Sequence, residues 1–463
     1  MVYDVVIKNG KIINPEKGTQ TVGNIGIADG VIKIITRADI DGKTEIDAKL
    51  KEVAPGFIDA HAHIDGHLGN GRLLALQGVT TVINGHCGIS PFPIKKFIEE
   101  QNIKGFIINQ VQLIGHTSLR EAIGVRNPNV SLSSKQIEKV NQLLEQELKN
   151  GAAGLSFGLE YIPATTKEEM LILSKTVAKY GKVVSVHSRS DGWQGLESLK
   201  EMIDITKMTG ASVIVSHVIF QYGFGMMKEA LTIIDTAVKE GYDISCDSGM
   251  YNSFTTYAGS NVLKDGCVER WECTYNDLFA VNGKYAGQRL TRESYEDLRK
   301  NYPDDIVIAM IGDEHEIYDA FNLPYMMVSS DAGSNKTENE SLGHPEDAGT
   351  FPAFFRKLVR EQGRLTLVDA VRRCTYLPAK KFGLENKGRM RIGADADIVI
   401  FDSQTILDNS KFSIEGKTNA PPDGIDYVLV NGKIVVEGKK VFNISPGEAI
   451  PMQCKLWKGE NFN

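Results

Sequence analysis

Two histidines, His61 and His63, follow an apolar run that begins at Val53 and are separated by a single residue. Side chains alternate along a β-strand with a period of two, so both imidazoles are expected on the same face. Two imidazoles on one side of a buried site supply half of a tetrahedral metal shell. The pair alone is a weak motif, so the prediction of a metal site depends on further donors elsewhere in the chain.

The distribution of histidine strengthens this prediction. The chain has nine histidines, and six of them stand at the C-terminal ends of apolar segments: His61, His63, His86, His116, His187 and His217. Histidines that only pack in a core would not be expected to gather at such positions. The active sites of parallel α/β barrels do lie there, because the C-terminal ends of the strands form the mouth of the barrel.

Three further polar residues occupy equivalent positions. Cys87 is a candidate thiolate ligand, with a small buried hydrophobic residue as the alternative. Glu160 could bridge two cations, or cap a helix, or lie on the surface. Asp331 could contact a metal and exchange a proton with its bound water, or form a turn. The joint set, on six strands, is more specific than any of its members: His61, His63, Cys87, Glu160, His187, His217 and Asp331.

Eight apolar segments predict the strands of a parallel α/β barrel. They cover residues 53–59, 79–85, 106–115, 153–159, 182–186, 212–216, 242–247 and 325–330. Amphipathic patterns between them, for example at 134–149 and 226–240, predict alternating helices. This order is typical of an α/β fold of the TIM-like (β/α)8 barrel class, which we place at residues 56–384. An insertion at about residues 250–320 is expected to shape the substrate pocket.

The two ends of the chain are predicted to form a second, smaller unit. Residues 4–13 are two β-runs around an Asn-Gly turn, and residues 426–435 repeat the pattern, with another β-run at 396–402. Neither end is large enough to bury a core alone. We therefore expect one small β-sandwich domain, built from residues 1–55 and 385–463.

The composition bounds the class of protein. A chain of 463 residues that is 42% hydrophobic and 24% charged resembles an ordinary globular protein with more than one unit. The net charge of −7 and the pI near 5.8 argue against nucleic acid as a partner. We find no apolar run of bilayer-spanning length and no signal-peptide pattern. Six scattered cysteines fit reduced thiols. The expectation is a cytoplasmic enzyme for a small molecule, with a homo-oligomer left open.

Several segments resemble a known family. APGFIDAHAH, the order of the histidines and Asp331, and the split β-domain resemble the amidohydrolase superfamily. GVTTVINGHCGISPFP, GLEYIPA, GHPEDAGTFP and KKFGLENKGRMRIGADADIVIFD look like its N-acyl-D-amino-acid deacylase (D-aminoacylase) branch. The resemblance covers nearly the whole chain and is weakest in the insertion. It implies a zinc-dependent hydrolase that cleaves a C–N amide bond.

The resemblance also implies roles for the individual residues. Cys87, His187 and His217 would hold a zinc ion, and His61 with His63 would form a weaker second site, so one or two ions are expected. Glu160 stands where many members of the superfamily carry a bridging carboxylated lysine. A metal-bound hydroxide would attack the amide, and Asp331 would act as general base and then as general acid. His61, His63 or His116 is a candidate for helping the metal to polarise the carbonyl, and Tyr251 matches a tyrosine near the substrate.

The chain departs from that branch at the positions that would bind a substrate carboxylate. Ile219 replaces a lysine two places after the strand-six histidine, and Glu346 and Asp347 lie in a motif where arginines are expected. Arg189 and Arg356 remain and could compensate. Alternatively, the two acids could face a neutral or cationic substrate, or lie in a solvated loop.

Three main functions compete on these residues, and deamination of a ring is a more distant fourth. The first is deacylation of an N-acyl-D-amino acid or a related derivative. The second is hydrolysis of a cyclic amide by a hydantoinase-like or dihydroorotase-like enzyme, which normally has a lysine at the position of Glu160 and does not need Cys87. The third is a scaffold without activity, which should have lost several of the donors that this chain retains.

Overall fold

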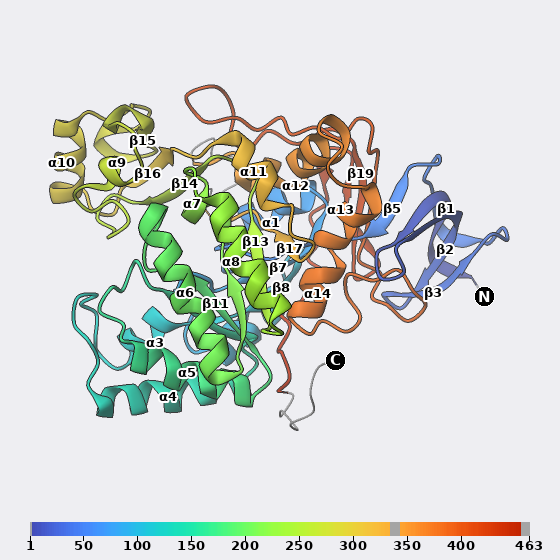
Figure 1. Cartoon of the computed structure of the whole chain (residues 1–463). Coiled ribbons are helices and arrows are strands. Elements are labelled where there is room, and N and C mark those ends of the chain that lie inside the picture. Colours follow the sequence, from blue (N-terminus) through green and yellow to red (C-terminus); the bar gives the residue numbers. More distant parts are fainter. Residues whose placement is uncertain (1, 334–342, 455–463) are drawn as a thin grey trace.

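In the computed structural model, the described residues are 2–333 and 343–454, and eight parallel strands form their central barrel (Figure 1). These strands are β6 (Phe57–Asp59), β7 (Val79–Asn84), β8 (Asn109–Gln112) continued by β9 (Ile114–Gly115), β10 (Gly154–Gly158), β11 (Val183–His187), β12 (Ser212–Val215), β13 (Ile244–Ser248) and β17 (Met326–Val328). All eight predicted segments therefore contain a strand.

Backbone hydrogen bonds close the eight strands into a TIM-like barrel. β6, β7 and β8 pair in parallel, as do β9, β10, β11, β12, β13 and β17 in that order. Only Leu113 separates β8 from β9, and its N–H donates to Asn84 O on β7 (2.9 Å). At the other side, the N–H of Ala60 donates to Val328 O (3.2 Å), which joins the end of β6 to β17.

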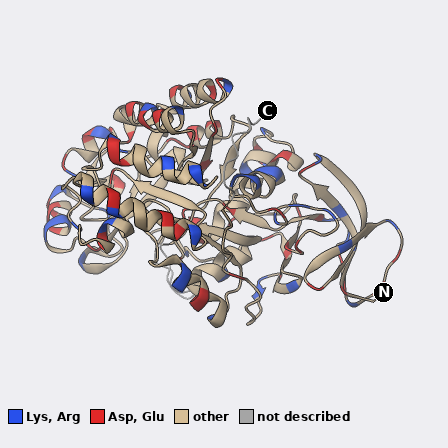
Figure 2. Ribbon diagram, turned by 90° about the horizontal axis from the view of Figure 1, so that it is seen from below, with Lys and Arg blue, Asp and Glu red and all other residues tan. Residues whose placement is uncertain are grey.

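Helices surround the barrel. They are α1 (Leu68–Leu76), α2 (Ile94–Lys104), α3 (His116–Ala122), α4 (Ser134–Lys149), α5 (Lys167–Lys179), α6 (Gly192–Thr209), α7 (Val218–Tyr222), α8 (Met227–Lys239), α12 (Glu346–Phe354), α13 (Leu367–Arg373) and α14 (Tyr376–Lys381), with a π-helical segment at Phe355–Glu361. In α4, a capping box begins the helix at Ser133, and Ile137, Val140, Leu144 and Leu148 are buried at helical spacing. Charged residues of both signs are interspersed over the outer helices (Figure 2).

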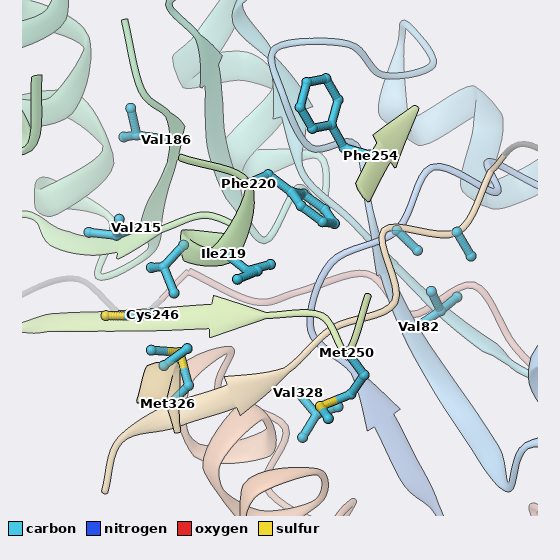
Figure 3. Packing of buried hydrophobic residues seen from close by; sticks show 14 of the residues in the cluster. Val82, Val186, Val215, Ile219, Phe220, Cys246, Met250, Phe254, Met326 and Val328 are labelled. Atoms are coloured by element: carbon cyan, nitrogen blue, oxygen red, sulfur yellow. The ribbon is translucent and has the colours of Figure 1, made fainter. Parts of the chain in front are cut away.

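The strand period separates the barrel interior from the layer under the helices. Val184 and Val186 of β11 pack in the cluster that includes the helices, whereas Val183 packs with interior residues of the other strands. Figure 3 shows Val186 beside Val215, Cys246 and Met326, which come from β12, β13 and β17. Val183 and the alternate residues that follow it on β11 therefore point into the barrel. The last of them is His187, the donor residue at the end of the strand.

The insertion before β17 forms a small unit of its own. It contains β14 (Ser253–Tyr257), α9 (Cys267–Arg270), β15 (Leu278–Ala280), α10 (Arg292–Asn301), β16 (Ile306–Met310) and α11 (Glu314–Ala320). β14, β16 and β15 form an antiparallel three-stranded sheet in that order. Figure 1 shows this sheet with α9 and α10 projecting from the barrel at one side.

Strands from both ends of the chain share a nine-stranded sheet. They are β1 (Tyr3–Asn14), β2 (Thr19–Ala28), β3 (Val31–Thr36), β4 (Gly42–Asp47), β5 (Glu52–Pro55), β18 (Ile398–Phe401), β19 (Ile425–Val430), β20 (Lys433–Glu437) and β21 (Lys440–Val441). The antiparallel pairing of β5 with β18 joins the two ends. One apolar cluster contains side chains from both, including Ile12, Ile25, Ile398 and Leu429.

Aromatic packing connects this sheet to the barrel. The ring of Phe57 on β6 lies 5.8 Å from Phe401 on β18 and 5.2 Å from Phe355, with all three side chains buried. Such contacts fix the position of the barrel relative to the sheet. Among the described residues, we find no helix with the length and apolar character that a bilayer-crossing segment requires.

Candidate metal centre

Three donor atoms from three strands meet at the mouth of the barrel. The Sγ of Cys87 lies 3.6 Å from Nδ1 of His187 and 3.4 Å from Nε2 of His217, and the two nitrogens are 3.1 Å apart. A tetrahedral zinc ion holds sulfur at about 2.3 Å and nitrogen at about 2.0–2.1 Å, which separates S from N by about 3.6 Å and N from N by about 3.3 Å. The chemistry and spacing of this trio therefore fit a zinc ion.

The protonation of the two rings suits metal binding. Burial lowers the pKa of His187 and of His217 to about 4, so both imidazoles are neutral at pH 7. A neutral ring keeps the lone pair that a metal requires. Burial raises the pKa of the Cys87 thiol well above its ordinary value, and the acidic groups of Asp331 and Asp247 add to this effect. A cation bound beside this thiol would reverse that preference, because a coordinated thiol is deprotonated.

A second group of donors overlaps the first. Oδ1 of Asp331 lies 3.4 Å from Nε2 of His61 and 3.2 Å from Nε2 of His63, while the same nitrogen of His61 lies 3.5 Å from Sγ of Cys87. Burial opposes ionisation of Asp331, but the contact with His63 and the charges of both rings lower its pKa below the ordinary value. Asp331 is therefore a carboxylate at neutral pH. Nε2 of His61 lies between its Oδ1 and the Sγ of Cys87.

Three donor residues adopt backbone conformations that ordinary side chains rarely occupy. The φ angles of Cys87, His217 and Asp331 are 52°, 31° and 60°. Each such residue costs about 1–3 kcal/mol, and such residues cluster at functional sites. The backbone around Cys87 also needs a glycine opposite it, because a Cβ added at Gly158 would lie 2.1 Å from its carbonyl oxygen. The fold therefore accepts strain at the strand ends that aim these donors.

Glu160 occupies a different place from the predicted bridge between two metals. Its Oε2 lies 3.3 Å from Nε2 of His187, on the side of the ring opposite the trio. Burial raises the pKa of Glu160 to about 7, although Arg270 acts in the opposite direction. The prediction of a bridging ligand is therefore corrected. A Glu160 carboxylate that accepts the Nε2–H of His187 would leave Nδ1 free to face the metal.

His116 also lies away from the donors. Its Nε2 is 2.7 Å from Oε1 of Glu169 on α5, and its ring packs against Phe157 at 5.0 Å. Because His116 is the first residue of α3, its side chain turns into the layer between strand and helix. The predicted role in polarising the substrate carbonyl is corrected accordingly.

Tyr251 is partly buried and lies beside the buried ring of His344. The two rings are 5.4 Å apart, and the Tyr251 hydroxyl is 3.3 Å from Oγ of Ser410. His344 contacts Oγ of Ser253 at 2.7 Å, and burial lowers its pKa to about 3. These contacts place Tyr251 next to the motif that begins at His344, and its contact with substrate stays a prediction.

Arg189 is engaged by other groups. Its Nε and Nη2 both lie 2.9 Å from the carboxylate of Glu201, and its remaining donors reach Pro163 O and Thr165 O at 2.9 and 3.1 Å. The guanidinium thus fastens the loop after β10 to α6. A carboxylate on the substrate would have to compete with Glu201 for it, so these contacts do not favour the role of substrate clamp, which stays a prediction.

The contacts of Arg189 with Glu201 and the loop after β10 lead to a testable prediction. We expect Arg189→Ala to lower the free energy of unfolding by about 1 kcal/mol, because a half-buried ion pair and two loop contacts are lost. The KM should change less than about twofold. Chemical denaturation and steady-state kinetics would measure both. Arg364→Ala, which removes a pair with Asp319 (2.6 Å), is the control. A large rise in KM without loss of stability would contradict the assignment.

Sequence reasoning missed a carboxylate beneath the centre. Asp247, on β13, accepts the backbone N–H of His217 (2.9 Å) and the Oγ–H of Ser329 (2.8 Å), and it lies 3.5 Å from Nδ1 of His61. It stands at the end of an apolar strand, so the same strand-end rule could have identified it. Asp247 holds the strained backbone of His217 in place.

Comparison with known proteins identifies the family. Two family models match the chain, both described as the amidohydrolase family: one covers residues 44–271 and the other residues 295–435. The chain belongs to the amidohydrolase family. The two matches leave out residues 272–294, which lie inside the insertion, and residues 1–43.

Curated relatives and solved structures give closer comparisons within this family. D-aminoacylase of Alcaligenes xylosoxydans xylosoxydans is 26% identical over 93% of this chain and 94% of its own length. N-acyl-D-glutamate deacylase of the same organism is 28% identical over 93% of both. The solved N-acyl-D-glutamate deacylase of Bordetella bronchiseptica, complexed with zinc and a phosphonate inhibitor, superposes with a TM-score of 0.87 at 26% identity, over 97% of this chain and 100% of that one.

Cyclic amide hydrolases are more distant from this chain. The L-hydantoinase structure from Arthrobacter aurescens has a TM-score of 0.64 at 18% identity, over 97% of this chain and 100% of that one, which indicates a shared fold alone. The deacylase reading of the sequence is therefore better supported than the cyclic-amide alternative.

Proposed function

We propose that this protein is a zinc-dependent amidohydrolase that removes the acyl group from an N-acyl-D-amino acid or a related derivative. The observation that carries the proposal is the trio of Cys87, His187 and His217, whose donor atoms lie 3.1–3.6 Å apart at the barrel mouth. D-aminoacylase and two N-acyl-D-amino-acid deacylases are 26–28% identical to this chain, whereas the dihydroorotases and the L-hydantoinase that match it over a similar length are 20–24% identical.

The trio would hold the first zinc ion. His61, His63 and Asp331 offer a second and more open donor set, because 30% of the His63 side chain is exposed whereas His61 is buried. One or two ions are therefore compatible with the donors. Bound zinc supplies Lewis acidity: it makes water a stronger acid and polarises the scissile carbonyl.

Asp331 is the residue that would move the proton. It is ionised at neutral pH, and His63 at 3.2 Å and His61 at 3.4 Å hold its Oδ1. We assign to it the removal of a proton from the attacking water as the new C–O bond forms. The same carboxyl group then gives that proton to the leaving nitrogen as the C–N bond breaks. The products are a carboxylate and a free amine.

The substrate of this site could carry a free carboxylate or lack one. Arg356, the second arginine that could bind a carboxylate, is paired with Asp408 at 2.6 Å and Glu361 at 2.8 Å. Glu346 is buried, and burial together with the charge of Asp331 raises its pKa well above the ordinary value. Because Glu346 and Asp347 are buried in the motif where arginines are expected in the deacylase branch, derivatives without a free carboxylate belong in the substrate screen.

A substrate screen tests the proposal. The zinc-loaded protein would be assayed for amine release from N-acetyl-D-methionine, N-acetyl-D-glutamate, N-acetyl-D-methioninamide and the L-form of each, and for ring opening of a 5-substituted hydantoin by the formation of the N-carbamoyl amino acid. We expect hydrolysis of at least one D-compound, with its L-counterpart slower by tenfold or more. Faster opening of the hydantoin ring than of any linear amide would contradict the proposal and favour a cyclic amide hydrolase.

We also propose a division of the chain into two domains. Residues 1–55 and 385–463 would form the small β-sandwich domain, and residues 56–384 the catalytic barrel with its insertion. The pairing of β5 with β18 and the apolar cluster shared by both ends support this division.

A further inference from the structure

We propose that the insertion between β13 and β17 is part of the metal centre, because its Arg270 holds Glu160 against His187 and so determines which nitrogen of that ring faces the metal. This inference rests on the proposed function, since it assumes that His187 is a zinc ligand. It gives Arg270 the role of a positioning residue and gives the insertion a task besides shaping the pocket.

The contact between Glu160 and His187 orients the ring of His187. Glu160 lies 3.3 Å from Nε2, whereas Nδ1 lies 3.6 Å from Sγ of Cys87 and 3.1 Å from Nε2 of His217. A neutral imidazole carries its proton on only one nitrogen. As long as Glu160 accepts from Nε2–H, Nδ1 keeps the lone pair for the metal.

The second contact holds Glu160 in place. Nη2 of Arg270 lies 3.5 Å from Oε1 of Glu160 and 2.8 Å from Val262 O, while Nε donates to Oδ1 of Asp191 at 2.5 Å. The indole N–H of Trp271 donates to the other oxygen of Asp191 at 2.6 Å. Both carboxylates are buried, with 2% of each side chain exposed, and would repel one another without the guanidinium between them.

The insertion and the barrel meet closely at this point. Asn261, also in the insertion, reaches the carbonyl oxygen of Tyr161 at 3.3 Å, and the ring of Tyr161 packs 4.9 Å from His187. On the other side, Gly192 begins α6 so near to the insertion that an added Cβ would lie 3.3 Å from Arg270 O. The segment that carries Glu160 is thus held between the insertion and the metal ligand.

Zinc affinity tests the inference without reference to any substrate. The dissociation constant would be measured by competition with a chromogenic chelator for the wild type, Arg270→Gln and Glu160→Gln. We expect each change to weaken zinc binding by about 10–100-fold. The matched control is Arg299→Gln, which removes another partly buried arginine of the insertion, one that bonds Ala258 O (2.8 Å) and Ser260 O (2.9 Å). It should alter zinc affinity less than threefold.

A double variant separates positioning from loss of folding. If Arg270 acts through Glu160, the double change Arg270→Gln with Glu160→Gln should weaken zinc binding little more than Glu160→Gln alone. Arg270→Lys, which keeps the charge, should recover part of the affinity. Thermal melting of the zinc-free proteins reports whether the variants fold, and Trp271→Phe offers a milder change if Arg270→Gln does not.

Two results would overturn the inference. One is unchanged zinc affinity in Arg270→Gln, or in Trp271→Phe if the former does not fold. The other is an equal loss in Arg299→Gln, which would mean that the insertion only stabilises the fold. A wild-type protein that binds no zinc would instead refute the proposed function, so the two failures are distinguishable.

Discussion

Replacing Asp331 by asparagine is expected to reduce kcat by about 10³-fold or more and to leave one zinc ion bound per chain. Asparagine preserves the shape of the side chain but cannot accept a proton, and a positioned acid or base contributes about 10²–10⁴-fold to rate. The zinc ion should stay because Cys87, His187 and His217 do not depend on this carboxylate for their spacing. Steady-state kinetics and metal analysis of the same preparation would measure both quantities.

The matched control for this prediction is a neighbouring acid. Asp65 stands two residues after His63 and accepts a hydrogen bond from Gln112 at 2.9 Å. Asp65→Asn should retain most of the activity. Loss of zinc from Asp331→Asn together with activity would contradict the assigned role, because it would make Asp331 a ligand that the first ion requires.

Replacing Cys87 by serine is expected to weaken zinc binding by more than about 100-fold and to abolish activity at limiting metal. The sulfur is the soft donor of the trio, and a serine hydroxyl is a poor substitute for a thiolate at a zinc ion. Serine is also smaller at the atom that bonds the metal, so both nitrogens would lose their shared partner. Competition with a chelator gives the affinity, and activity is then measured across added zinc concentrations.

A second buried cysteine provides the control. The thiol of Cys374 donates to Ala370 O at 3.3 Å and Val371 O at 3.5 Å, which a hydroxyl can also do. Cys374→Ser should therefore bind zinc as the wild type does. Equal zinc affinity in Cys87→Ser and the wild type would exclude sulfur ligation.

The barrel could be predicted from the sequence because its signals are local. Each strand is a short apolar run, and the period of two places Val183, Ser185 and His187 on the interior side of one strand. The donors follow from the same rule, since the ends of parallel strands meet at one rim. The meeting of Cys87, His187 and His217 thus depends on a fold whose elements the sequence already indicates.

The remaining features of the site could not be predicted from the sequence, because they depend on tertiary contacts. No local pattern tells which nitrogen of the His187 ring Glu160 contacts, or that Arg189 forms an ion pair with Glu201. His116 follows a strand as the donors do, but it opens a helix and turns away from the mouth. Arg270 lies in the insertion, which has no repeating pattern to align it with the barrel. Its contact with Glu160 joins residues 110 positions apart in the sequence.

The central claim is that Cys87, His187 and His217 bind one ion together. The most direct measurement is a crystal structure of the zinc-loaded protein with anomalous data collected on both sides of the zinc absorption edge. We predict an anomalous peak about 2.3 Å from Sγ of Cys87 and about 2.0–2.1 Å from Nδ1 of His187 and Nε2 of His217. A protein that retains zinc with its anomalous peak elsewhere, or with His187 bound through Nε2, would contradict the account.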